Sequence, residues 1–147
     1  MNIVFDFGGV VFRWQPLALL RETLPQCAGD DEQARAVAAE LFQGYAPQGD
    51  WGAFDRGEIE VATLAQRIAR RTSLSEAEVL SFVDAVPGHL EPISETVALL
   101  GRLKAAGHRL FFLSNMPAPF AEHLQRSHAC MACFEDGALS SQASLTE

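Results

Sequence analysis

The chain begins with a short apolar run that has no polar alternation and ends in an aspartate followed by glycines. Residues 3–5 are Ile-Val-Phe, and Asp6, Phe7, Gly8 and Gly9 follow directly. An unalternating apolar run of this kind predicts a strand buried on both faces, as in parallel sheets. In open parallel sheets, ligands bind just beyond the carboxyl ends of the strands, so Asp6 is placed where chemistry takes place. The glycines permit a sharp turn and a close approach of the backbone to a bound group.

An aspartate after a strand also starts turns, and on this segment alone both interpretations of Asp6 stay open. A second unalternating run, at residues 110–113, favours the functional interpretation. It follows a helical pattern and ends in Ser114 and Asn115. We therefore expect residues 3–6 to pair with this run in a parallel sheet. Asp6 and Ser114 should then lie within about 10 Å of each other, which is the span of one bound phosphate and its contacts.

The middle of the chain is predicted to be helical. Apolar residues recur at helical spacing in segments 34–41 and 61–68. A strand, a helical insertion of roughly 70 residues and a return to strand-helix alternation predict an α/β fold with two parts. We expect a discontinuous parallel-sheet core at residues 1–14 and 88–147, with the helical insertion at residues 15–87.

Local signals place several boundaries inside this insertion. Ser75 and Glu78 have the spacing of a capping box, which predicts a helix that starts there and runs to about Ala85. Pro87-Gly88 is expected to break this helix. The segment 44–57 is rich in glycine and contains a proline, so it is expected to form a loop.

Taken together, these segments resemble the haloacid dehalogenase-like hydrolase superfamily. Residues 5–10, Phe-Asp-Phe-Gly-Gly-Val, look like its first motif, in the branch with glycine two residues after the aspartate, and residues 113–115 look like its second motif. Segments 92–107 and 134–137 are similar to the helix before the second motif and to the segment after it. The resemblance implies a Rossmann-like α/β core. It also implies that residues 15–87 are a helical cap that closes over the active site and selects the substrate.

The resemblance further implies a Mg²⁺-dependent phosphatase of small phosphorylated metabolites. Asp6 would be the nucleophile that forms an aspartyl-phosphate, and it would also ligate Mg²⁺. The backbone carbonyl of Gly8 would be a second metal ligand, and the Gly9 backbone would bind phosphate. Ser114 would hydrogen-bond the phosphoryl oxygens, assisted by the amide of Asn115. A helix N-cap is the structural alternative for Ser114, and it does not exclude the functional role.

The chain departs from this superfamily in two places. Gly8 stands where many of these phosphatases carry a second aspartate as general acid and base, and a glycine cannot transfer protons. The branch that shares this glycine nevertheless includes enzymes of sugar phosphates. Near the other end, Glu147 stands about where the family has a lysine, and the paired acidic metal ligands of the family do not follow. We therefore expect a member that lacks the family's C-terminal third and is impaired as a hydrolase. The alternative is a non-catalytic remnant that binds a partner.

The bulk composition bears on partners and compartment. Eleven basic and 19 acidic residues give a formal net charge of −8, which argues against nucleic acid or an anionic membrane surface as a partner. No apolar stretch approaches the roughly 20 residues of a membrane span. Three cysteines, an odd number, fit a reducing compartment, so we expect a cytoplasmic protein. In the resembling family a further strand flanks the first one, so residues 3–5 would form a bare edge here, and we expect self-association through it.

Two of the cysteines have the spacing of a redox pair or of half a zinc site. Cys130 and Cys133 follow His123 and His128, and no second Cys or His pair comes after them. The segment follows a helical pattern rather than preceding one. On the sequence, packing as small apolar side chains is favoured over a metal or redox role.

Overall fold

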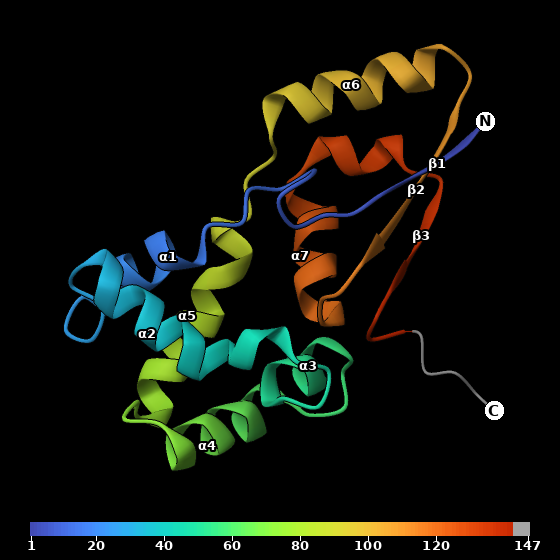
Figure 1. Ribbon diagram of the computed structural model, residues 1–147. Helices are drawn as coiled ribbons and strands as arrows, with labels where there is room; N and C mark the ends of the chain where they lie inside the picture. Colours follow the sequence, from blue (N-terminus) through green and yellow to red (C-terminus); the bar gives the residue numbers. More distant parts are fainter. Residues whose placement is uncertain (143–147) are drawn as a thin grey trace. The chain divides into compact units, whose positions relative to one another are not determined.

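A computed structural model describes residues 1–142 and divides the chain into two compact units (Figure 1). The first unit combines Met1–Trp14 with the chain from Pro87 onward, and the second is Gln15–Val86. The first contains a parallel sheet with helices, and the second contains helices. The α/β class expected from the sequence is confirmed.

Three strands form the sheet of the first unit among the described residues. Their order is β1 (Asn2–Phe5), β2 (Arg109–Ser114) and β3 (Asp136–Leu139), and both pairs are parallel. Ile3 lies opposite Leu110 in the β1–β2 ladder. The expected pairing of residues 3–6 with residues 110–113 is therefore confirmed.

Burial alternates along these strands, so the expectation that they are buried on both faces is wrong for the described residues. Leu110 and Phe112 of β2 are buried, whereas Leu113 is 59% exposed and Val4 of β1 is 60% exposed. The physical reason lies in the connections. The strand order advances in one direction only, and right-handed crossovers then place both connecting helices on the same face. These helices are α6 (Ser94–Ala105) and α7 (Ala118–Ser127), and the short 3₁₀-helix η2 (Ala129–Cys133) follows α7.

Aromatic side chains fill the covered face beneath the carboxyl ends of the strands. The Phe7 ring stacks on Phe112 at a centroid distance of 4.6 Å, and Phe134 packs edge-on against Phe112 at 5.7 Å. Phe12 completes the cluster against Phe7 at 5.3 Å. Phe7 directly follows Asp6, so this cluster anchors the segment that contains the expected nucleophile.

The second unit is helical, as expected, and has its own aromatic core. Trp51 packs edge-on against Phe42 with ring centroids 4.7 Å apart, and Phe82 lies 5.9 Å from Phe42. The helices are α1 (Pro16–Thr23), α2 (Asp31–Phe42), η1 (Gln43–Tyr45), α3 (Asp50–Asp55), α4 (Val61–Arg71) and α5 (Glu76–His89).

Helix α5 confirms its predicted start and corrects its predicted end. The Ser75 N–H donates to Glu78 Oε2 at 2.8 Å, and the Glu78 N–H donates to Ser75 Oγ at 3.2 Å, which is a complete capping box. The helix does not break at Pro87 but continues to His89. Pro87 falls in the last turn, where its missing N–H removes one terminal hydrogen bond and leaves the rest of the helix intact.

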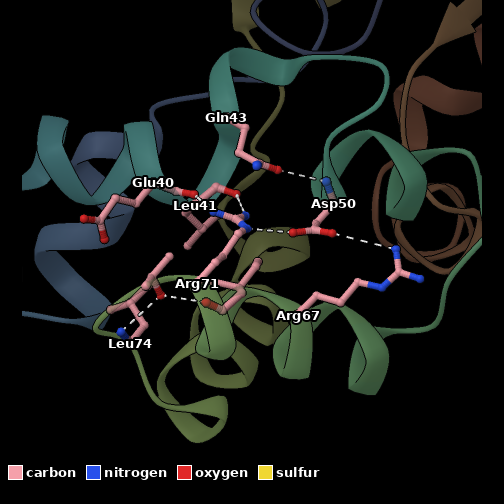
Figure 2. A network of polar contacts seen from close by, with 9 residues as sticks. Glu40, Leu41, Gln43, Asp50, Arg67, Arg71 and Leu74 are labelled. Carbon is pink, nitrogen blue, oxygen red and sulfur yellow. Dashed lines mark hydrogen bonds and ion pairs between the residues drawn. The ribbon is translucent and has the colours of Figure 1, made fainter.

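The segment 44–57 also differs from the loop expected there, because α3 forms within it. Figure 2 shows the contacts that fix its start: the Asp50 N–H donates to the Gln43 side chain at 3.0 Å, and Arg71 Nε donates to Asp50 Oδ2 at 2.7 Å. Arg71 also donates to the carbonyls of Glu40 and Leu41 near the end of α2. So short a helix is unstable alone, and tertiary contacts decide its conformation.

Candidate active site

Asp6 and Ser114 lie at the carboxyl ends of neighbouring parallel strands. Phe5 and Phe112 are the last paired residues of the β1–β2 ladder. Asp6 is one residue beyond that pair on one strand, and Ser114 is two residues beyond it on the other. Because paired strands run about 4.8 Å apart, both backbones reach the same edge of the sheet. That the two side chains meet on one phosphate stays a prediction.

The turn after Asp6 is closed around the carbonyl of Phe7. This oxygen accepts the N–H groups of Val10, Val11 and Phe12 at 3.2, 3.0 and 2.9 Å. Gly9 has a φ of 74° and donates its N–H to the Phe12 carbonyl at 2.8 Å. A positive φ of this size favours glycine, so the second glycine of the motif is required by the backbone itself.

The start of α6 holds this turn from the other side. The Thr96 hydroxyl donates to the carbonyl of Val10 at 2.7 Å, and the Ile93 N–H donates to the carbonyl of Val11 at 2.8 Å. The segment that resembles the helix before the second motif therefore positions the loop of the first motif. Asp6 itself is exposed, and one of its carboxylate oxygens accepts the Phe7 N–H at 2.6 Å.

The second motif lies at the end of β2. Ser114 is only 5% exposed, and its carbonyl accepts the Ser140 N–H at 3.0 Å, whereas Asn115 is exposed. The N-cap of α7 is Pro117, and no side chain caps that helix. The N-cap alternative for Ser114 is therefore wrong, because an irregular segment separates the strand end from the helix.

Sequence reasoning gave no role to Ser141, which follows β3. A turn closes there with a hydrogen bond from the Gln142 N–H to the Leu139 carbonyl at 3.0 Å. The Ser141 hydroxyl oxygen is buried, and within residues 1–142 it has no hydrogen-bond partner. Its position after the third parallel strand, at the same kind of strand end as Asp6 and Ser114, is the signal that could have found it.

A Mg²⁺ site at this edge of the sheet stays a prediction. The two donors expected from the sequence are the Asp6 carboxylate and the Gly8 carbonyl. Within residues 1–142 no group of three or more His, Cys, Asp or Glu side chains is placed to hold a metal ion. Mg²⁺ is commonly held by one or two carboxylates together with substrate phosphates and water, so two protein oxygens fit only a site that the substrate completes. Glu147, which stands at the family's lysine position, lies outside the described residues.

The carboxyl groups with strongly shifted pKa values lie in the helical unit and not at the sheet edge. Burial raises the pKa of Asp55 to about 7, and the Arg56 charge opposes this rise. The Ser75 N–H, together with the Gln26 and Ser75 side chains, lowers the pKa of Glu78 to about 2. Both groups bear on the stability of the helical unit.

The fold can be compared with solved structures. A HAD family enzyme from Bacteroides thetaiotaomicron, in complex with magnesium and inorganic phosphate, superposes on this chain with a TM-score of 0.61 at 14% identity. The matched region covers 99% of this chain and 72% of the enzyme. Its magnesium complex also gives a TM-score of 0.61, at 17% identity over 99% of this chain and 71% of the enzyme. The chain has a haloacid dehalogenase-like fold. The Rossmann-like α/β core that the resemblance implied is thereby confirmed as a fold.

One curated protein is similar to this chain in sequence. A sesquiterpene phosphatase of Aspergillus oryzae is 26% identical over 125 residues, which is 85% of this chain and 56% of the phosphatase. The chain thus spans little more than half the length of that relative. No family model matches this chain. The described part of the chain contains no helix that is both long and apolar enough to cross a membrane.

Proposed function

We propose that this chain acts as a haloacid dehalogenase-like phosphatase of small phosphorylated metabolites. The observation that supports this most is the parallel pairing of β1 with β2, because it brings the Asp6 and Ser114 segments to one sheet edge. The similarity to a sesquiterpene phosphatase supports the same reaction class. The substrate class is part of the proposal, and an isoprenoid phosphate is the first candidate to test.

In the proposed reaction, an oxygen of the Asp6 carboxylate attacks the phosphorus of the substrate. The bond between phosphorus and the substrate oxygen breaks, and the product is an aspartyl-phosphate and an alcohol. Water then attacks the phosphorus, releases inorganic phosphate and regenerates the carboxylate. Ser114 and Asn115 donate hydrogen bonds to the phosphoryl oxygens. The Gly9 N–H, which the sequence predicts as a phosphate donor, already donates to the Phe12 carbonyl at 2.8 Å and is not counted among these donors. Because Gly8 cannot donate a proton, the leaving alcohol takes its proton from solvent.

Asp6 and the Gly8 carbonyl would hold Mg²⁺ in this proposal, together with the substrate phosphate. When bound, the ion would neutralise negative charge on the phosphoryl group. A structural neighbour is described as a complex with magnesium and inorganic phosphate, which supports the choice of metal. With two protein donors, we expect weak metal binding and slow turnover. Assignment of residues 15–87 as the cap, self-association through β1 and a cytoplasmic location also stay proposals.

The decisive experiment compares phosphate release by the wild-type chain and by Asp6→Asn, with Mg²⁺ and with sugar, aryl and isoprenoid phosphates. Asp6→Asn is expected to abolish release, whereas Asp84→Asn, which changes an exposed aspartate of α5, should leave it unchanged. Binding of inorganic phosphate, followed by ³¹P NMR, tests the site even where turnover is slow. Release that survives Asp6→Asn would refute the proposed nucleophile. Absence of both turnover and Asp6-dependent phosphate binding would favour the non-catalytic alternative.

A further inference from the structure

The first unit contains a pair of cysteines that the proposed reaction does not use. Cys130 and Cys133 lie on η2, are both half-buried and are both free thiols. In a 3₁₀-helix the side chains at i and i+3 eclipse each other, and three residues advance about 6 Å along the axis. The expected Cα separation of about 6 Å falls within the roughly 4.4–6.8 Å that disulfides span. The 3₁₀ geometry, which the sequence did not reveal, therefore brings the two thiols to one face of the helix.

Contacts in the middle of η2 and at its C-terminal end keep it in this conformation. The Lys104 ammonium donates to the carbonyls of Ala132 and Cys133 at 2.8 and 3.4 Å, which satisfies the C-terminal end of the helix. Met131 is buried between the two cysteines, and the next residue, Phe134, is part of the aromatic cluster. The pair is thus fixed to the core of the unit, while both cysteines stay partly exposed.

Two other roles for the pair fit less well. A metal centre lacks ligands, because residues 1–142 contain no group of three His, Cys, Asp or Glu side chains that could hold one. Inert core cysteines are commonly fully buried, and neither of these two is. Burial and the neighbouring Cys133 raise the pKa of Cys130, as expected for two thiols in proximity. The third cysteine, Cys27, lies in the helical unit and contacts Glu78.

We propose that Cys130 and Cys133 are a thiol–disulfide couple that exchanges with low-molecular-weight disulfides of the glutathione type. The thiolate of one cysteine attacks a sulfur of glutathione disulfide, which breaks that S–S bond and releases one glutathione thiolate. The thiolate of the other cysteine attacks the protein sulfur of the mixed disulfide, closes the intramolecular bond and releases the second glutathione. The protein gives up two electrons to glutathione disulfide, and the two thiol protons pass to the released thiolates. This couple is independent of the proposed phosphatase activity.

The test equilibrates the native chain with mixtures of reduced and oxidised glutathione, quenches with acid, and then alkylates the remaining thiols for intact-mass and peptide analysis. The wild-type chain should lose about 2 Da, the mass of two hydrogens, with no adduct, and one of its three thiols should stay alkylatable. The Cys27→Ser control should form the same disulfide and leave no thiol. Cys133→Ser should form only a mixed disulfide.

A denatured reference separates the effect of the fold from that of sequence proximity. The same equilibration in concentrated urea should give a disulfide-forming constant about tenfold lower than in the native chain, because η2 no longer preorganises the pair. Three alkylatable thiols in the oxidised native chain would overturn the proposal. Glutathione adducts equally frequent at Cys27, Cys130 and Cys133 would do the same, as would equal constants in the native and denatured chains.

Discussion

Replacing Gly137 by alanine should damage the sheet directly beneath the candidate site. A Cβ atom at this position of β3 would lie 2.4 Å from Cγ, Cδ1 and Cδ2 of the Phe112 ring. Non-bonded carbon atoms prefer separations of about 3.5–4.0 Å, so the ring would have to move by at least about 1 Å. It has little room to do so, because Phe7 stacks on it at 4.6 Å and Phe134 packs against it at 5.7 Å.

Gly137→Ala is expected to lower the free energy of unfolding by about 2–3 kcal/mol, in the upper part of the range for overpacked cores. Hydrogen-exchange mass spectrometry of the β2 and β3 peptides should report this loss in the first unit. Peptides of α2 and α4 should keep their protection. The control is Gly101→Ala, at an exposed helical position of α6 where an added Cβ meets nothing within 4 Å, and it should stabilise by about 0.5–1 kcal/mol.

A second substitution tests the stated cause. Phe112→Leu removes the ring that the new methyl group meets, so Gly137→Ala should cost much less in that background, with a coupling energy of about 1 kcal/mol or more. The reasoning fails if Gly137→Ala changes protection of β2 and β3 by less than about 0.5 kcal/mol. It also fails if the two substitutions are simply additive.

Three further outcomes follow from the charges and edges of the structure. Because the pKa of Asp55 is raised from 3.8 to about 7, its contribution to stability is present at low pH and is lost as pH rises through that window. Asp55→Asn should therefore reduce the fall in unfolding free energy between pH 4 and 8 by at most about 4 kcal/mol. The unfolding free energy is measured by urea titration at each pH, and an unchanged pH dependence would contradict this reasoning. The pKa of Glu78 is lowered to about 2, so its contribution is present above pH 4.5 and lost as pH falls toward 2. Glu78→Ala should lower the free energy of unfolding by about 1 kcal/mol at pH 7 and by little at pH 2. The control is Glu76→Ala, outside the capping box, which should lower it by less at pH 7. If β1 self-associates, Val4→Lys should shift the mass measured by light scattering toward that of the monomer, and the control Val10→Lys should not. A wild-type chain that is monomeric at all concentrations rules the association out.

The sequence predicted those parts of the fold that depend on local pattern. The run at residues 110–113 is a strand because its side chains suit a buried ladder, and the capping box at Ser75 forms because its partners are three residues apart. The same locality explains the turn after Asp6, where Gly9 has the positive φ that its residue type favours.

The parts that sequence reasoning missed depend on contacts between distant segments. Helix α3 forms in a glycine-rich segment because Arg71 and Gln43 bind Asp50 and because Trp51 is buried. One-sided burial of the sheet depends on strand order, which no single strand encodes. At the site, the order of the motifs located Asp6 and Ser114, whereas no motif marked Ser141. Its hydroxyl is buried and has no hydrogen-bond partner within residues 1–142, which is a property of the assembled strands.

The β1–β2 ladder has a consequence for how the chain reaches its folded state. Asn2 pairs with Arg109, so closing this ladder encloses more than a hundred residues and carries a large loop entropy. The helical unit, Gln15–Val86, lies entirely inside that loop and is held by its own core. If this unit folds first, it replaces most of the flexible loop with a compact body. Closing the β1–β2 ladder then costs less conformational entropy. Local helices should therefore form early, and the edge that bears Asp6 should be among the last parts to become ordered.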